Sequence, residues 1–433
     1  MLQGLKEMIK RRTKVTIGKN DLKTEILAGV TSFFAISYIM IVNPLILSDA
    51  GIPVNLSIFA TIIISVLGCL LMAVWANAPI ILTPGMGVNA FFTYTLVVGM
   101  HFTWQVAIAV SLVSSFLYLV IAFTPLSRVL AESIPDVLKT GITVGIGLFL
   151  VELGLEKAGL ITAGSNGSLL AFGSLQNPTT LLALFGLTLT VILYVKKIPG
   201  NFIIGIIVTS LVGAAFKIKG QATTVDVTQI KEYGKLLFQG DFQEIGQLKF
   251  WLAVFSMTMI LVFESMGLLE GLLPDKNKFK KSFQSSAITA LLSGICGTSP
   301  TVAAAESAAG IESGGRTGIV AGVASLLFAS SIFLVRFLKY VPEAAIAPVI
   351  IITGALMMQQ LQHIQIQDFS EWFPAFLIIV LIPLSGSIAI GLSFGFVSYP
   401  ILKIMTKKTD ISPIMWILSM LFLINLVCTA FLN

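Results

Sequence analysis

Two glutamates stand in stretches of sequence that are otherwise apolar. Glu264 lies in "MILVFESMGLLEG", after the uncharged run 250–263, and Glu306 lies in "TVAAAESAAG". A charged carboxylate at the centre of a bilayer costs about 2.5–3.5 kcal/mol on insertion scales, so such residues usually line a cavity. Burial disfavours the charged form of a carboxyl group, which would let either residue gain and lose a proton. The alternative is a structural hydrogen bond between helices, and this fits Glu270 and Glu312 better because they lie nearer the expected helix ends.

Proline interrupts two apolar stretches, and polar residues accompany each interruption. "LTPGMGVNAFF" contains Thr83–Pro84 and Asn89, and "GTSPTVAAAES" contains Ser299–Pro300. Ser or Thr is a good N-cap and proline is favoured at the first helical position, so we expect a half-helix to begin at each proline after an extended segment. Glu306 would then lie two turns into the second half-helix. The alternative is a simple kink at each proline.

Two broken spans of this kind predict a small polar chamber. Non-helical backbone at membrane depth persists only where protein or a watery cavity satisfies its polar groups. Broken spans in corresponding positions of two halves are the best sequence indication of a transporter's binding site. The amide of Asn89 offers donors and an acceptor, so it could bridge to the eighth span or touch a ligand directly.

The composition places these residues in an integral membrane protein. Of 433 residues, 56% are hydrophobic and 11% are charged, whereas about a quarter are charged in a soluble domain. The net charge is +6, but the basic residues form short clusters between apolar runs, which favours positive-inside loops over a nucleic-acid surface. Isolated cysteines and histidines predict no disulfide, no metal site and no cofactor, and without a nucleophile motif we expect no enzyme.

We expect an all-α polytopic membrane protein with about fourteen membrane segments in two inverted repeats of seven. Apolar runs long enough to span fill 25–216 and 250–433, and the polar linker 217–249 separates them. The segment 1–24 is expected to be cytoplasmic, and alternation then places the basic loops inside and the linker outside. The last run, 411–433, either spans the membrane or lies along its surface.

Weak similarity between the halves supports duplication. "IPDVLKTGITVGIGLFL" and "VPEAAIAPVIIITGALMM" align Pro135 with Pro342 and Gly147 with Gly354. Chance similarity between two apolar helices is the alternative.

Four segments resemble purine permeases of the nucleobase–cation symporter-2 family, in its AzgA-like adenine/guanine/hypoxanthine branch. They are "EILAGVTSFFAISYIMIVNP", "TPGMGVNAFF", "IPDVLKTGITVGIGLFLVELGLEKAGLI" and "GTSPTVAAAESAAGIESGGRTG". The resemblance implies the fold of the bacterial uracil transporter, with short strands in the broken third and tenth spans. It implies a core domain, here 25–125 and 250–338, and a gate domain, here 134–216 and 343–433. It also implies proton-driven import of guanine, hypoxanthine or adenine across the cell membrane by an elevator-like movement.

The resemblance also indicates which residues form the site. Asn89 matches the asparagine of the third-span motif, Glu264 the acid of the eighth span, and Glu306 the glutamate of the tenth. Backbone near Thr83 and Ala305 would complete the pocket, and Glu264 and Glu306 are the candidates for proton coupling.

An aromatic ring is the remaining candidate for the pocket. Phe263 could stack on a flat base, although most phenylalanines in membranes only fill space or face lipid.

One position departs from the pattern of the resembled branch. Many members carry two aspartates three residues apart in the eighth span, where this chain has Leu261 and Glu264. The departure leaves the particular purine open. The alternative function is transport of another nucleobase, or exchange of a small anion such as sulfate or bicarbonate on the same fold. The expected partners are a small nucleobase, protons and the lipid bilayer, with a homodimer left open and nucleic acid excluded.

Overall fold

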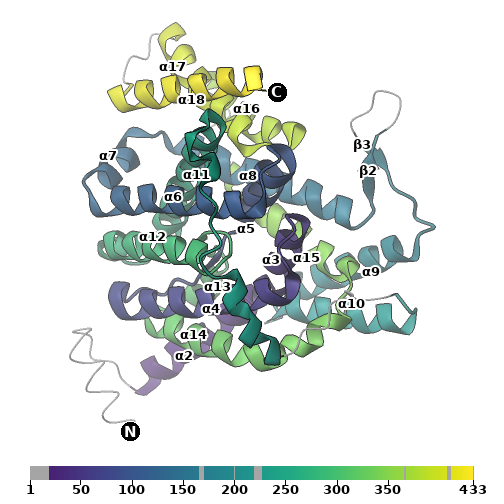
Figure 1. Cartoon of the computed structure of the whole chain (residues 1–433). Coiled ribbons are helices and arrows are strands. Elements are labelled where there is room, and N and C mark those ends of the chain that lie inside the picture. The colour runs from purple at the N-terminus through teal and green to yellow at the C-terminus, as the bar shows by residue number, and fades with distance from the viewer. Residues whose placement is uncertain are drawn as a thin grey trace.

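The computed structural model describes residues 19–164, 170–198, 200–218, 227–364, 367–406 and 411–432 (Figure 1). Most of the segment 1–24, which we expect to be cytoplasmic, lies outside these residues. The described chain is mostly helical, with four strands of three residues each. The expectation of an all-α polytopic protein is therefore confirmed.

The first half of the chain contains seven apolar segments, the first and third of which are interrupted. Its elements are α2 (Lys19–Ile36), α3 (Ile39–Asp49), α4 (Val54–Leu71), η1 (Met72–Ala76), β1 (Leu82–Pro84), α5 (Met86–Ala90), η2 (Phe91–Gly99), α6 (Trp104–Phe123), α7 (Leu126–Ser133), α8 (Asp136–Lys157), β2 (Ile161–Ala163), β3 (Leu170–Phe172), α9 (Pro178–Val195) and α10 (Asn201–Ala215). The β2–β3 hairpin projects from one end of the molecule in Figure 1.

The second half follows a linker that carries two 3₁₀ helices, η3 (Val227–Leu236) and η4 (Gln243–Gly246). The elements of the second half are α11 (Leu248–Leu272), η5 (Lys276–Lys278), α12 (Phe279–Ile295), β4 (Thr301–Ala303), α13 (Ser307–Glu312), α14 (Ile319–Ser331), η6 (Ile332–Tyr340), α15 (Glu343–Met358), η7 (Gln359–His363), α16 (Phe369–Ser385), α17 (Ile388–Met405) and α18 (Pro413–Leu432). We call α2–α3 span 1, β1–α5–η2 span 3, α11 span 8, β4–α13 span 10 and α15 span 12.

The helices establish a multi-pass integral membrane protein. Ten helices in the described residues are long and apolar enough to cross a bilayer, and three more apolar helices are shorter. The count of about fourteen segments remains a prediction. The last helix, α18, follows the seven segments expected after the linker.

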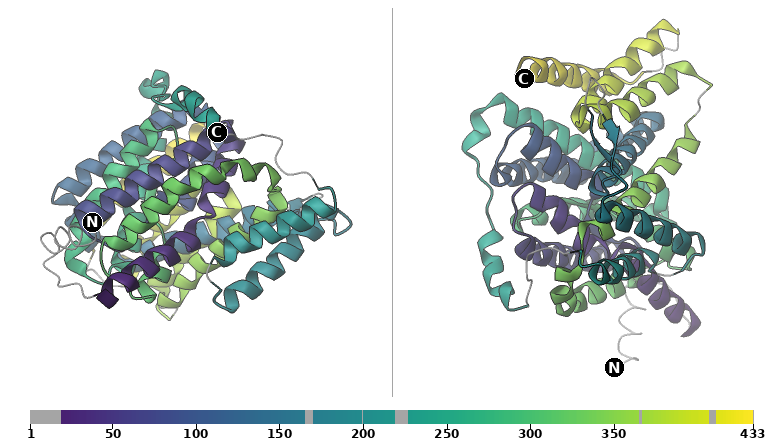
Figure 2. Two further views of the ribbon diagram at one scale, coloured as in Figure 1. Left: turned by 90° about the horizontal axis from the view of Figure 1, so that it is seen from below. Right: turned by 90° about the vertical axis from the view of Figure 1, so that its right-hand side faces the viewer.

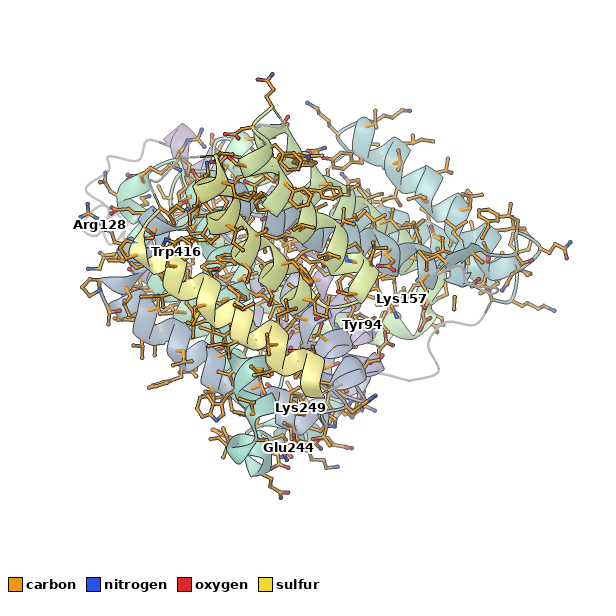
Figure 3. All side chains as sticks on the ribbon, turned by 90° about the horizontal axis from the view of Figure 1, so that it is seen from above. Tyr94, Arg128, Lys157, Glu244, Lys249 and Trp416 are labelled. Carbon is orange, nitrogen blue, oxygen red and sulfur yellow. The ribbon has the colours of Figure 1, made fainter. Side chains whose placement is uncertain are left out.

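The last helix, α18, packs against α7 and α11, and whether this apolar run spans the membrane stays a prediction. Ser412, just before α18, donates to the carbonyl of Ser133 at the end of α7, and Asn425 donates to Ser256 of α11 at 2.9 Å. Figure 3 shows α18 running from Trp416, near Arg128, towards Lys249 at the start of α11. The helix therefore runs antiparallel to α11 along most of its length.

The helices form two groups of neighbours. In one, α6, α12, α4, α14 and α2 lie in contact in that order, and α11 packs on α6 (Figure 1). In the other, α8 contacts α15 and α16, α9 contacts α10 and α15, and α17 joins α16 to α18. Figure 2 shows α16, α17 and α18 gathered at one edge of the molecule.

Equivalent residues of the two halves meet in the interior. Gly147 of α8 lies against Gly354 of α15, where a Cβ at Gly147 would sit 2.7 Å from the Gly354 carbonyl oxygen. The strands of the two broken spans also pair with each other, antiparallel, with Thr83 opposite Val302. Contacts between equivalent positions are what an axis of two-fold pseudosymmetry between inverted repeats produces.

The expected strands are confirmed, but the expected helix starts are wrong. Pro84 ends β1, and α5 begins at Met86 with Gly85 as its N-cap. In span 10, Pro300 precedes β4, and α13 begins only at Ser307. Pro84 lies in the two-stranded ladder and Pro300 lies beside it. Proline has no N–H to donate, and it is tolerated at the edge of a ladder, where that N–H would not bond to the other strand. Glu306 is therefore the N-cap residue of α13, not a residue two turns inside a helix.

Candidate functional site

Glu306 lies where span 10 turns from strand to helix. The preceding residue, Ala305, is exposed, and Glu306 itself is partly exposed in the interior of the helical bundle. The hydroxyl of Tyr38 donates to Oε1 of Glu306, and Oγ1 of Thr353 donates to the Tyr38 oxygen at 3.2 Å. The carboxylate is thus held on one side and open to a ligand on the other.

Glu264 faces the first half-helix from span 8. Its side chain is buried, and its Oε2 has no hydrogen-bond partner among the described residues. A Cβ added at Gly87 of α5 would lie 3.3 Å from this oxygen, so the absence of a side chain at Gly87 makes room for the carboxylate. Because a buried carboxylate oxygen without a partner is costly, Glu264 is suited to accept an N–H from a ligand or to hold a proton.

Asn89 is fully buried and links the two broken spans. Its Oδ1 accepts a hydrogen bond from the hydroxyl of Ser299, while its Nδ2 has no partner among the described residues. The amide of Asn89 therefore bridges to the residues just before β4, whereas a bridge to the eighth span is not seen among the described hydrogen bonds.

A buried polar network continues from Ser299 into span 1. Asn43 of α3 donates to Thr61 at 2.7 Å and to Thr298 at 3.3 Å, and its Oδ1 lies 3.4 Å from the Ser299 hydroxyl oxygen. Such a network fixes the backbone breaks, because its polar groups satisfy one another away from water.

The other predicted residues occupy two different places. Thr83 is buried in β1 opposite Val302, so its backbone is committed to the ladder beside the site. The ring of Phe263 stacks on Phe396 of α17, with centroids 5.5 Å apart and planes 8° apart. Thr83 thus lies in the ladder whose second strand leads to Ala305 and Glu306, whereas Phe263 of α11 packs against α17.

Sequence reasoning missed three residues of this region: Tyr38, Asn43 and Thr353. Tyr38 and Asn43 are polar residues in the uncharged stretch 26–48, the same signal that singled out Asn89. The span is also interrupted at Ser37–Tyr38, between α2 and α3. Thr353 gave no signal, because single hydroxyls are common in membrane helices.

The ionisable groups of the site are the carboxyl groups of Glu264 and Glu306, without a basic partner among the described ion pairs. The two lysines of α8 lie at its ends: Lys139 pairs with Asp136 at 2.9 Å, and Lys157 pairs with Asp49 at 2.7 Å. No group of three or more His, Cys, Asp or Glu in the described part of the chain is placed to hold a metal ion. An anion would be repelled here, whereas a neutral ligand rich in N–H donors would be complementary.

Comparisons with known proteins agree on a family. The sequence model of a family described as the Permease family matches residues 23–394. The nucleobase transporter PlAzg2 of Paenibacillus larvae is 43% identical over 91% of this chain and 80% of its own length. The guanine/hypoxanthine permease PbuO of Bacillus subtilis is 35% identical over 94% and 98%, and the adenine permease AdeP of Escherichia coli is 33% identical over 97% and 96%.

Solved structures share the fold at low sequence identity. The transmembrane domain of the cyanobacterial bicarbonate transporter BicA has a TM-score of 0.64 at 16% identity, covering 86% of this chain and 97% of that one. The structure of SLC26A9 has a TM-score of 0.62 at 13% identity, covering 94% and 68%. These likenesses confirm the inverted-repeat transporter fold and carry no information on the ligand.

Proposed function

The chain belongs to this permease family and is a transporter rather than an enzyme, and on that premise we propose that it imports purine nucleobases, with guanine or hypoxanthine preferred to adenine. The first support is that the relatives above are named as carriers of nucleobases, guanine and hypoxanthine, or adenine. They match nearly the whole chain.

The observation that carries the proposal is the unpartnered carboxylate of Glu264 beside the half-helix of span 3. Guanine presents the adjacent N1–H and N2–H donors along one edge, which a carboxylate accepts as two parallel hydrogen bonds, and hypoxanthine presents the N1–H donor alone. Glu306, partly exposed at the second break, would bind a second edge of the same base. A flat neutral base would thus sit between two acceptors.

We further propose that transport is coupled to protons through Glu264, with Glu306 mainly orienting the base. Moving an unpaired charge past apolar helices is costly, and a proton on the carboxyl group removes that cost. The proton would be taken up on the outer side together with the base and lost to the cytoplasm, which weakens the site and releases the base.

The moving parts would be the two groups of helices. A core domain, 25–125 and 250–338, would carry both broken spans past a gate domain, 134–216 and 343–433, in an elevator-like movement. The N-terminal segment 1–24 would be cytoplasmic and the linker 217–249 extracellular. The end of the molecule that bears Lys157 and the β2–β3 hairpin would then face outwards, and the protein would reside in the cell membrane.

Uptake of radiolabelled hypoxanthine by cells that express the protein tests this function. Unlabelled guanine and hypoxanthine should compete best, adenine less well, and sulfate or bicarbonate not at all. A protonophore should collapse accumulation, and replacing sodium should change nothing. The proposal fails if no purine competes. Competition by bicarbonate or sulfate instead would favour the anion exchanger, the second candidate, which the shared fold alone supports.

A further inference from the structure

Tyr38 lies at the break in span 1 and touches both proposed domains. Its hydroxyl donates to Glu306 and accepts from Thr353 of α15 at 3.2 Å. Its side chain is fully buried, and its ring meets Phe202 of α10 edge-on, with centroids 5.3 Å apart and planes at 79°. Tyr38 itself keeps helical backbone angles (φ −58°, ψ −24°), so the change from α2 to α3 is confined to the turn at Ser37–Tyr38.

The contacts of Tyr38 divide along the proposed domain boundary. Tyr38 and Glu306 both belong to the proposed core, so their hydrogen bond would travel with the core. Thr353 and Phe202 belong to the proposed gate, so the contacts of Tyr38 with them would break when the core moves. The bond between Tyr38 and Thr353 is therefore specific to the arrangement in this structure.

The chemistry of the phenol suits a link between site and gate. A tyrosine hydroxyl donates one hydrogen bond and accepts others, and a threonine hydroxyl does the same. Here the donors point from Thr353 to Tyr38 to Glu306. If Glu306 took a proton on the bonded oxygen, it would donate to Tyr38, and Tyr38 would in turn donate to Thr353. The Tyr38 hydroxyl can therefore bond to Glu306 in either protonation state, and reversal of the chain changes Tyr38 from the acceptor to the donor in its bond with Thr353.

We propose that Tyr38 is a positioning residue that holds the Glu306 carboxylate for the ligand and transmits its state to the gate through Thr353. The inference rests on the proposed function, because it assigns Tyr38 a role in that same site. Two effects follow from the two contacts. Loss of the Tyr38 hydroxyl should disturb binding as well as movement, whereas loss of the Thr353 hydroxyl should disturb movement alone.

The test compares Tyr38→Phe, Thr353→Val and the double variant by initial rates of hypoxanthine uptake, normalised to the amount of protein at the membrane. Tyr38→Phe keeps the ring and should raise KM about tenfold or more, the usual effect of losing one hydrogen bond to a charged group. Thr353→Val should leave KM within about twofold and change the maximal rate at least about threefold, the effect of one neutral hydrogen bond. Its direction depends on which half of the cycle limits the rate.

The double variant and the conservative variant separate coupling from general damage. If Thr353 acts only through Tyr38, the double variant should match Tyr38→Phe within about twofold. Thr353→Ser keeps the hydroxyl and should behave as the unmodified protein.

Two buried residues elsewhere provide matched controls. Tyr118 donates to the carbonyl of Phe283 at 3.3 Å within the core, and Thr209 of α10 is buried with an unpartnered hydroxyl. Tyr118→Phe and Thr209→Val should leave both kinetic parameters unchanged. If the unmodified protein and both controls take up no purine, the proposed function fails. If they transport normally, two outcomes refute the role of Tyr38. One is that Tyr38→Phe or Thr353→Val has the kinetic parameters of its control. The other is that the effects of the two substitutions on uptake multiply in the double variant.

Discussion

The two broken spans pair in one ladder, yet only one of them is open to a ligand. In span 3 a single residue separates β1 from α5, and all five residues of α5 are buried. In span 10 three residues separate β4 from α13, and among them Ala305 is exposed and Glu306 partly exposed. The inverted repeat fixes where the breaks lie, but it does not give them the same role.

The polar partners of each break explain the difference. Asn89 of span 3 is sealed from solvent, and its Oδ1 accepts from Ser299 of the opposite break, while its Nδ2 has no partner among the described residues. Glu306 of span 10 is held by Tyr38 from span 1 and keeps a free side. We therefore interpret span 3 as the support of the site and span 10 as the part that contacts the ligand. Glu264 lies against Gly87, and in the proposed site span 3 would act on the ligand through this carboxylate.

The largest effect is expected at Glu264. Glu264→Gln keeps the shape but cannot exchange a proton, so accumulation of hypoxanthine against a gradient should be abolished, while some exchange remains. Proteoliposomes with an imposed pH difference provide the measurement. Glu312→Gln, an exposed glutamate of α13, is the control and should accumulate normally. Accumulation by Glu264→Gln under the pH difference would exclude Glu264 as the proton carrier.

The next effect tests whether span 10 contacts the ligand. Glu306→Gln removes a charged acceptor, and one such hydrogen bond contributes about 1.5–3 kcal/mol. We expect kcat/KM for hypoxanthine to fall about 10- to 100-fold, with the purified protein as stable as before. The same Glu312→Gln variant is the control. An unchanged KM in Glu306→Gln would show that Glu306 does not contact the ligand, and the assignment of span 10 as the contacting break would be wrong.

A smaller effect is expected from filling the space beside Glu264. In Gly87→Ala the new Cβ would lie 2.7 Å from Ile146 Cγ2 and 3.3 Å from Glu264 Oε2, so α5 must shift. Contacts this close displace neighbours at a cost of about 1–3 kcal/mol, and uptake should fall about tenfold. The control is Gly267→Ala, one turn beyond Glu264 in α11, where a Cβ meets nothing within 4 Å. Equal uptake rates in the two alanine variants would show that Gly87 does not seat the carboxylate.

Stability should distinguish Asn89 from the ligand-facing residues. Asn89→Ala removes the closer of the two amide acceptors of Ser299, which should lower the free energy of unfolding by about 1–3 kcal/mol. Uptake should fall because the breaks loosen, with little change in KM. Thermal unfolding in detergent and uptake kinetics are the measurements.

A second buried asparagine provides the control for Asn89. Asn425 of α18 is buried and donates to Ser256 of α11 at 2.9 Å, outside both broken spans. Asn425→Ala should lose similar stability but keep its uptake. A raised KM in Asn89→Ala without loss of stability would place Asn89 against the ligand.

The sequence predicted the elements of this site better than their contacts. Breaks at Pro84 and Pro300, strands before the half-helices and the equivalence of Gly147 with Gly354 all follow from local signals, and the structure confirms them. The helix starts could not be predicted, because β1 and β4 use their residues to pair with each other across the chain. A local capping rule does not include that distant partner.

The contacts of span 1 were beyond sequence reasoning for the same reason. Tyr38 was visible as a polar residue in an apolar span, but its partner Glu306 lies in the other half of the chain. Local signals indicate that a polar group needs a partner, and only the fold determines which partner it meets.

The smallest effect is expected at the outer end of span 3, where Lys157 of α8 pairs with Asp49 at 2.7 Å and Tyr94 donates to the same carboxylate at 2.6 Å. Figure 3 shows Tyr94 and Lys157 close together, far from Arg128 at the proposed cytoplasmic end. The side chains of the pair are 17% and 31% exposed, so the pair should contribute about 1 kcal/mol or less. Because the pair ties span 1, and through Tyr94 also span 3, to the proposed gate away from the site, Lys157→Gln should change the maximal rate of uptake at most about fivefold and leave KM unaltered. Lys235→Gln, which removes an exposed pair with Glu232 in the linker, should change neither. If Lys157→Gln instead raises KM as strongly as Glu306→Gln, the outer end of span 3 senses the ligand, and the division between a supporting break and a contacting break does not hold.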